Sequence, residues 1–471
     1  MVLKILYAVL PAVLPSKYYF PVILAGVTLF AIYTYAQGRK TSRERDLHGR
    51  TILVTGAFTP IGLTLLDSLA RRGAHIIALS SEPVDAGQPA IFIPLLRTTT
   101  NNENVYAEQC DLTSPASIRA FCTGFVKAEE QRLDAIIFAH EYAPVGSIYS
   151  SSQITVEKMR RAASCATFML ATLLLPVLLV APVERDIRLI TLINPFYAAA
   201  APNFSVSVTS TPGLASPPAQ ASLLAVEGRR ALRSAILMRH FQRVMDALPG
   251  GAQVPRTDTA ASSIPVVSDK AQRSNIVAMS VSPGMSRTDI VAPLLDADAS
   301  RGPVFWRGLL LYVLFNPLFR LVTKSPASAL EAVLHTLFLP TPFKIIATSL
   351  EESTVERSEE EILKPGSLYA ECAVVRLRVP PAPAPPENDS GEDGPGKGKM
   401  EADEATGSKP KLDDGELGGE VLGTMVWEEY ERELKEWEAA EVEVLREAQE
   451  REKAEKSRDG RHTPPTVDTP S

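Results

Sequence analysis

The chain of 471 residues is poor in the residues that build disulfide-stapled or metal-bound proteins. Neither its four cysteines nor its six histidines have the spacing of a zinc site. The cysteines also lack a paired framework, which predicts reduced, mostly buried thiols in a cytosol-facing domain. They are Cys110, Cys122, Cys165 and Cys372. No basic stripe stands out in a chain of net charge −7, which excludes nucleic acid as a partner.

Charge is absent from residues 18–36, and aromatic residues lie near both ends of this stretch. These features are typical of a membrane helix, which needs about 20 residues. Five basic residues follow: Arg39, Lys40, Arg43, Arg45 and Arg50. By the positive-inside rule, residues 1–45 predict a single-pass anchor with a cytoplasmic body. A cleaved signal peptide is the alternative, but a small-residue cleavage site is missing. The endoplasmic reticulum, a lipid droplet and the mitochondrial outer membrane all remain open as locations.

The C-terminal part of the chain divides by composition into three segments. Residues 380–415 are rich in Pro, Gly, Asp, Glu and Lys and predict a disordered linker. Residues 416–458 predict a charged helix with coiled-coil character, and residues 459–471 predict a disordered tail. One face of that helix carries an apolar stripe of Trp427, Tyr430, Leu434 and Trp437. We expect this stripe to dock on the body or on a protein partner.

The stretch 51–62 organises the folded part of the chain. An apolar run rich in β-branched residues ends at Gly56, and a helical pattern begins near Pro60. Strand, glycine turn and helix form the first half of a βαβ nucleotide-binding unit, whose phosphates lie at the helix N-terminus. The middle glycine of such a loop is replaced by Pro60, which removes a backbone donor and adds a ring.

Short apolar runs alternate with helical patterns over residues 46–379. This alternation predicts an α/β fold with a doubly wound, mostly parallel, Rossmann-like sheet. We expect strands at 51–55, 75–79, 105–109, 133–138, 187–193 and 275–281. We expect helices at 60–72, 114–126, 156–179 and 219–248. Residues 83–104, 198–218 and 250–273 are expected as connections.

Residues 303–322 are apolar and aromatic, and Asn316 and Pro317 interrupt them, so we do not predict a second membrane span. Three interpretations remain open: an interfacial helix lying on the bilayer, a lid over an apolar substrate pocket, and a buried core helix.

The order of these pieces, over about residues 47–345, resembles the short-chain dehydrogenase/reductase family. Residues 46–56 are similar to its entry strand, and residues 70–75 to the end of its first helix and its second strand. The Lys324-Ser325-Pro326 run and Leu368-Tyr369 resemble the membrane-anchored, retinol-dehydrogenase-type branch.

Two further motifs connect the resemblance to a cofactor. Asp111-Leu112 resembles the pair whose acid contacts adenine, and Pro283-Gly284, with Thr288, resembles the turn over the nicotinamide. The family implies NAD or NADP, and the residues after the second strand do not decide between them. It places the cofactor on Thr55, Gly56, Thr59, Ile61, Gly62, Asp111, Leu112, Pro283 and Gly284. With Pro60 in the loop, we expect weak or absent binding.

The catalytic positions depart from the family pattern. The family uses a tyrosine acid/base, a lysine four residues later, and a serine that orients the substrate. Here the tyrosine place is Ala225, the lysine place is Arg229, and the serine place falls on Asn194 or Ile193. Alanine has no proton to give, and arginine is not equivalent to lysine. We therefore expect no catalytic residue at the usual positions. Possible substitutes at the carboxyl edge of the sheet are His140, Tyr142 and Tyr197.

Two functions follow from these observations. The first is a catalytically impaired protein, a pseudoenzyme that acts as a scaffold or nucleotide-binding module at a membrane. The alternative is an active NAD(P)-dependent oxidoreductase on a lipidic alcohol or ketone. The expected partners are membrane lipid, a protein bound through the C-terminal helix or residues 303–322, and a second copy of the chain.

Overall fold

The computed structural model describes most of the body and parts of both terminal segments. The described residues are 19–128, 132–148, 153–182, 185–205, 222–248, 275–298, 306–341, 361–381 and 415–459. The predicted linker at 380–415, the connection at 250–273 and the tail at 459–471 fall almost entirely outside these ranges.

One sheet of eight strands forms the centre of the described structure, in the order β3-β2-β1-β4-β5-β6-β7-β8. All neighbours are parallel except β7 and β8. The strands are β1 (Thr51–Thr55), β2 (His75–Ser80), β3 (Val105–Gln109), β4 (Ala135–Phe138), β5 (Ile187–Leu192), β6 (Ile276–Ser282), β7 (Leu368–Ala370) and β8 (Ala373–Val374). The predicted fold class is confirmed, and the six predicted strands are present within about two residues.

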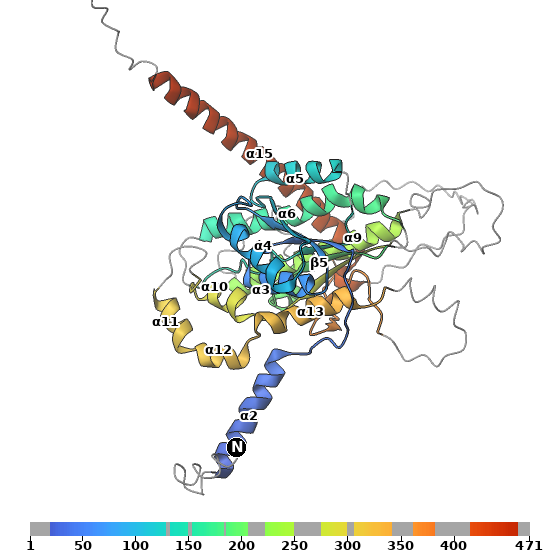
Figure 1. Cartoon of the computed structure of the whole chain (residues 1–471), viewed down its shortest axis with the longest axis vertical. Helices are drawn as coiled ribbons and strands as arrows, with labels where there is room; N and C mark the ends of the chain where they lie inside the picture. Colours follow the sequence, from blue (N-terminus) through green and yellow to red (C-terminus); the bar gives the residue numbers. More distant parts are fainter. Residues whose placement is uncertain are drawn as a thin grey trace, which may run out of the picture.

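Helices cover both faces of the sheet (Figure 1). One apolar core lies between the sheet and α3 (Pro60–Ala70), α4 (Gly87–Thr100) and α13 (Pro326–Phe338). A second core lies on the opposite face, under α5 (Pro115–Lys127), α6 (Gln153–Val180) and α9 (Leu223–Ala247). The central strands are buried along their whole length, as expected for a parallel sheet covered on both sides.

Helix α4 lies in a stretch that the sequence predicts as a connection. Residues 83–104 were predicted as a connection, yet 87–100 form a helix that contains Pro94. Ile93 and Leu96 of this helix are buried in the core beside α3. Packing of these apolar side chains therefore outweighs the backbone hydrogen bond that a proline removes.

The two terminal helices lie on different sides of the body (Figure 1). Helix α2 (Tyr19–Gln37) is long and apolar enough to cross a membrane, and none of residues 20–37 is buried. Residues 157–180 of α6 pass the same test of length and composition, but 61% of that window is buried. Helix α6 is therefore a core helix. Helix α15 (Gly419–Asp459) follows the short turn η6 (Glu416–Gly418) and packs on the second core.

The apolar stretch 303–322 contains two short helices, α11 (Trp306–Leu314) and α12 (Asn316–Val322). Gly308 is their only buried residue, so the interpretation as a buried core helix was wrong. The break between them falls at Phe315, beside the predicted interruption.

Candidate functional site

The carboxyl ends of β1, β4, β5 and β6 meet at one edge of the sheet. Ligands of open α/β sheets bind at this edge, outside the strand ends. The structure brings most of the predicted site residues here: Thr55, Gly56, Thr59, Ile61, Gly62, His140, Tyr142, Asn194, Tyr197, Pro283 and Gly284.

The two glycines of the loop after β1 are required by close packing. Gly56 has a φ of +65°, and a Cβ there would lie 2.7 Å from the backbone nitrogen of His140. A Cβ on Gly62 would overlap the carbonyl oxygen of Gly56. Both glycines therefore have a structural role that needs no nucleotide.

The first turn of α3 satisfies most of its own donors. Thr59 is the N-cap, and its Oγ1 accepts from the Gly62 N–H at 3.1 Å. Its carbonyl oxygen accepts from the Leu63 N–H at 2.8 Å, and Pro60 at the first helical position has no N–H. Of the donors that would point toward a phosphate, this leaves the N–H of Ile61.

The Ile61 N–H donates to a carboxylate of the chain itself, Asp289, at 3.0 Å. Asp289 lies in η4 (Arg287–Val291), after the proline-glycine turn, and is 1% exposed. Its other oxygen accepts from the hydroxyls of Ser286 at 2.7 Å and Thr288 at 2.9 Å. The positive end of the helix therefore faces an internal anion.

This arrangement does not fit the pyrophosphate of a dinucleotide. A pyrophosphate at a helix N-terminus needs free N–H donors, and none remains in the first turn of α3. The Asp289 carboxylate would also repel a second anion at this position.

The other predicted cofactor residues are also engaged within the chain. Asp111 accepts from the N–H and hydroxyl of Thr113 at 2.9 and 2.8 Å, and Leu112 packs on the second core. The carbonyl of Pro283 accepts from Lys324 Nζ at 3.1 Å. The carbonyl of Gly284 accepts from the Tyr142 hydroxyl at 2.7 Å.

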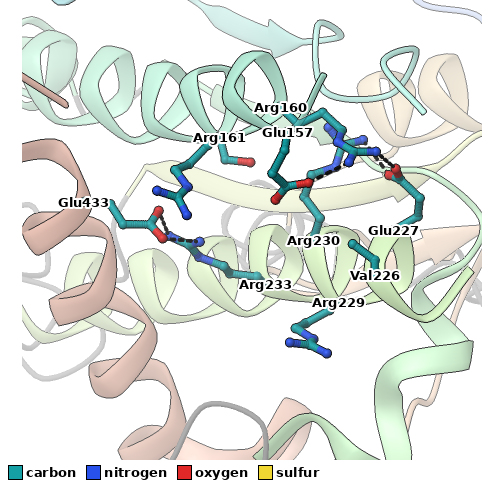
Figure 2. A pocket seen from close by; sticks show the side chains of 10 residues that line it. Glu157, Arg160, Arg161, Val226, Glu227, Arg229, Arg230, Arg233 and Glu433 are labelled. Carbon is teal, nitrogen blue, oxygen red and sulfur yellow. Dashed lines mark hydrogen bonds and ion pairs between the residues drawn. The ribbon is translucent and has the colours of Figure 1, made fainter. Parts of the chain in front are cut away.

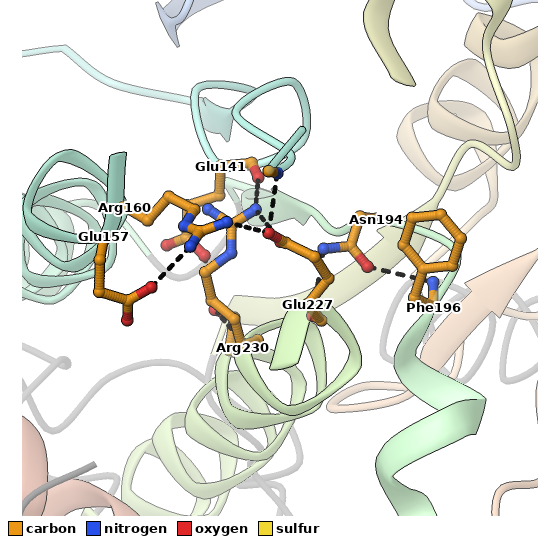
Figure 3. Close-up of polar contacts among 9 residues, drawn as sticks. Glu141, Glu157, Arg160, Asn194, Phe196, Glu227 and Arg230 are labelled. Atoms are coloured by element: carbon orange, nitrogen blue, oxygen red, sulfur yellow. Dashed lines mark hydrogen bonds and ion pairs between the residues drawn. The ribbon is translucent and has the colours of Figure 1, made fainter. Parts of the chain in front are cut away.

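The three positions aligned with the catalytic residues of the family lie around the first turns of α9. Ala225 is in the first turn, and its N–H donates to the carbonyl of the N-cap Ser222 at 2.9 Å. Arg229 points away from the other charged side chains of this region (Figure 2). Asn194 accepts from the Phe196 N–H at 3.1 Å and donates to the Glu227 carbonyl at 3.2 Å (Figure 3). Both ends of the Asn194 amide are thus bonded within the chain.

A buried ionic network stands beside Asn194 (Figure 3). Glu227, 1% exposed, pairs with Arg160 of α6 and accepts from the Gly146 N–H at 2.9 Å. Its second oxygen lies 3.3 Å from Arg230, which also donates to the Glu141 carbonyl at 3.0 Å. The network connects the loop after β4 to α6 and α9, so it fixes the shape of this edge.

His140 is held by hydrogen bonds at both ring nitrogens. Nε2 lies 2.9 Å from the Ala163 carbonyl, which can only accept, so this nitrogen carries the hydrogen. Nδ1 then accepts from the Thr55 hydroxyl at 2.6 Å. Burial lowers the pKa of His140 from its usual 6.5, which favours this neutral tautomer. Neither nitrogen is free to exchange a proton with a substrate.

The two candidate tyrosines differ in accessibility. Tyr142 is fully buried, donates to the Gly284 carbonyl at 2.7 Å and accepts from the Ser286 N–H at 3.2 Å. Burial raises its pKa well above the usual 10, so it remains protonated. Tyr197 begins α7 (Tyr197–Ala200) and is half-buried. Burial and then the charge of Glu371 raise its pKa.

A small cavity lies between α6, α9 and α15 (Figure 2). It measures about 40 Å³, enough for a water molecule but not for a lipidic alcohol. Arg233 closes one end by pairing with Glu433 of α15 at 2.5 Å. Within the described ranges, no group of three His, Cys, Asp or Glu side chains has the geometry to hold a metal ion.

Sequence reasoning missed Asp289, Glu227 and the arginines that pair with Glu227. Asp289 stands next to the quoted Thr288, and the N-capping serine Ser286 is the one local signal near it. Glu227 lies between the two positions aligned with the catalytic pair, but nothing in the sequence indicates that it faces Arg160.

Comparison with known proteins identifies the family. The profile described as KR domain matches residues 50–174. An uncharacterised oxidoreductase of Schizosaccharomyces pombe, pbr1, is 27% identical over 351 residues, covering 73% of this chain and 84% of its own length.

Two human proteins match shorter parts. Dehydrogenase/reductase SDR family member 13 is 33% identical over 33% of this chain, and retinol dehydrogenase 11 is 40% identical over 20%. The chain spans 39% and 28% of these two proteins. Together with the strand order and the glycine loop, these matches assign the chain to the short-chain dehydrogenase/reductase family, among relatives of the retinol-dehydrogenase type.

Proposed function

We propose that this protein is a membrane-tethered member of the family that has lost its oxidoreductase chemistry and acts as a scaffold at a membrane surface. One observation carries the proposal. At the carboxyl edge of the sheet, the polar groups that the family reaction needs are either absent or bonded to the chain itself.

The reaction needs a proton donor within hydrogen-bond reach of the reacting oxygen. Ala225 has no such donor, and Arg229 is not equivalent to the lysine of the family. Both ring nitrogens of His140 and the hydroxyl of Tyr142 already form hydrogen bonds within the chain, so none of them is free to exchange a proton with a substrate. Of the three possible substitutes, this leaves Tyr197.

We also propose that dinucleotide binding is weak or absent, and the Asp289 carboxylate supports this. To bind, a pyrophosphate would have to displace a buried acid that accepts three hydrogen bonds. Such charge-assisted bonds are worth about 1.5–3 kcal/mol each, so displacement is costly.

The alternative is an active oxidoreductase on a lipidic alcohol or ketone. It is favoured by the oxidoreductase names of the relatives and by the half-buried Tyr197 at the ligand edge. Its raised pKa would keep this hydroxyl protonated at neutral pH, as a general acid requires.

Titration of the purified full-length chain in detergent with NADPH and NADH tests the proposal. We expect no saturable binding and no turnover of a retinoid, a sterol or an acyl ketone. The Asp289→Asn variant should gain affinity for NADPH, because it removes the negative charge and keeps an acceptor for the Ile61 N–H.

A matched control removes a partly exposed acid from α3, the helix whose N-terminus Asp289 faces. Asp67→Asn on α3 should leave nucleotide affinity unchanged, because Asp67 pairs with Arg71 on the helix surface. Saturable NADPH binding by the unmodified chain, together with turnover, would establish the alternative. Binding without turnover would leave a nucleotide-binding scaffold.

A further inference from the structure

Helices α11 and α12 expose an apolar surface of unusual extent. Trp306, Leu310, Val313 and Leu314 of α11 are 58–65% exposed, and Leu318 of α12 is 49% exposed. No residue of α12 is buried. Soluble monomers rarely expose a contiguous apolar patch of this kind unless it binds a partner.

Helix α12 packs against the end of α2 where the chain enters the body. Gln37, the last residue of α2, donates to the Thr323 carbonyl at 3.2 Å, directly after α12. The amide oxygen of Gln37 accepts from the Ser328 hydroxyl at 2.8 Å and the Ser325 N–H at 3.4 Å. These bonds fix α12 beside the end of α2.

The position of α2 determines what covers α11 and α12. Residues 20–35 are uncharged, mostly apolar and exposed, which suits hydrocarbon. The basic residues begin at Arg39, so the membrane surface lies near Gln37. Figure 1 shows α11 and α12 on the same side of the body as α2.

The charges on α11 and α12 suit the same surface. Arg307 and Arg320 are exposed, and the Arg307 guanidinium lies 5.4 Å from the ring centre of Trp306. Tryptophan with arginine at the edge of an apolar patch is typical of helices that lie in the headgroup layer of a bilayer.

We propose that α11 and α12 form a second membrane contact, inserted in the headgroup layer of the leaflet from which α2 emerges. The partner is a lipid surface containing anionic lipid. The proposal rests on the tether of the proposed function, because α2 supplies the position of the membrane.

The contact has a consequence for the candidate site. Lys324, two residues after α12, pairs with Glu371 and donates to the carbonyl of Pro283 at 3.1 Å. The proline-glycine turn is thereby attached to the membrane-facing element. The second contact holds the carboxyl edge of the sheet close to the bilayer, where a lipidic ligand or a membrane-bound partner would approach it.

Fluorescent labels on single introduced cysteines test this inference in the full-length chain. The chain is reconstituted in vesicles of phosphatidylcholine and phosphatidylserine that carry nitroxide lipids. The probes are Leu310→Cys on α11, Leu29→Cys on α2 and Val442→Cys on the outer part of α15. All three positions are at least 50% exposed, and the four native cysteines are buried.

We expect a shallow nitroxide to quench the label at position 310 and a deep nitroxide to quench the label at 29. The label at 442 should be quenched by aqueous iodide and by neither nitroxide, because this part of α15 lies away from α2 (Figure 1). Iodide should not reach the label at 310.

Two results overturn the inference, and they are distinguishable. If 29 is quenched by lipid and 310 is not, α11 and α12 serve as a lid or a protein interface and the tether stands. If neither is quenched, the tether itself fails, and the second contact fails with it. Because the labelled side chains are exposed, unchanged melting temperatures will show that each variant is folded.

Discussion

At the scale of single residues, two buried carboxylates lie at the positions where the family pattern predicts cofactor and catalytic contacts. Asp289 accepts a hydrogen bond from the Ile61 N–H, the donor that a phosphate would use. Glu227 of α9 pairs with Arg160 of α6, beside the positions aligned with the catalytic residues. Both are about 1% exposed, and a buried charge is tolerated only when its partners satisfy it. These acids are therefore fixed parts of the fold.

The glycine loop allows a test of its structural role. Gly62→Ala should destabilise the protein by about 1–3 kcal/mol, because the new Cβ would overlap the Gly56 carbonyl. Gly124→Ala in α5 is the matched control, since a Cβ there meets nothing within 4 Å. It should stabilise by about 0.5–1 kcal/mol through helix propensity. Urea unfolding midpoints in detergent measure both changes, and equal effects would contradict the prediction.

His140 predicts a dependence of stability on pH. Burial holds its pKa in the folded protein below 6.5, so the unfolded chain takes up a proton at a higher pH than the folded one. Its contribution is complete above about pH 6.5 and is lost as pH falls through the folded pKa. Burial also lowers the pKa values of His240 and His335, which adds in the same direction.

The measurement is the melting temperature between about pH 7.5 and pH 5.5, the range around the ordinary histidine pKa. It should fall as the pH falls. His140→Gln should be less stable at the upper end and should show a shallower slope. An unchanged slope would show that His140 takes up its proton equally well in the folded state.

At the scale of elements, strands and helices could be predicted where their apolar residues form a continuous run or repeat at a regular spacing. Strands β1, β5 and β6 are mostly apolar runs buried on both faces, and such runs are visible in sequence. Strands β7 and β8 have three and two residues, too few for a period. Helix α4 was missed because its prolines indicate a connection, while its stability comes from packing on α3.

Helix α15 is held by a mixed apolar and ionic contact. Tyr430 is buried, stacks on Phe168 of α6 with ring centres 5.5 Å apart, and lies under the Arg233 guanidinium at 3.9 Å. Arg233 pairs with Glu433 at 2.5 Å, and both side chains are about 5% exposed. The predicted stripe thus docks on the body, through Tyr430 and Trp427 in particular.

The buried pair between Arg233 of α9 and Glu433 of α15 predicts how strongly α15 is held on the body. Arg233→Met should cost about 3–5 kcal/mol, because it leaves the Glu433 carboxylate buried without its partner. Arg233→Met with Glu433→Leu should recover much of that loss. Arg446→Met, in an exposed pair on the same helix, should cost less than about 0.5 kcal/mol. Urea unfolding followed by tryptophan fluorescence measures the three variants, and a loss in Arg233→Met as small as the control would contradict the prediction.

At the scale of the whole molecule, the body lies between two projecting helices. Helix α2, with α11 and α12, defines one side, and the outer part of α15 extends from another (Figure 1). If α2 crosses a bilayer as proposed, the outer part of α15 points into the aqueous phase. This arrangement would suit a scaffold that joins a membrane to a soluble partner.

The sequence by itself determined the sheet, the family resemblance, the apolar helix near the N-terminus and the residue types at the positions aligned with the catalytic tyrosine and lysine. Each of these is a local pattern: a period, a glycine turn, an uncharged run, or the residue type at one position. Tertiary structure alone decided that Asp289 meets Ile61 across 228 positions and that Glu227 meets Arg160 across 67. Local patterns carry no information about which distant side chains meet, because that depends on how helices and strands pack.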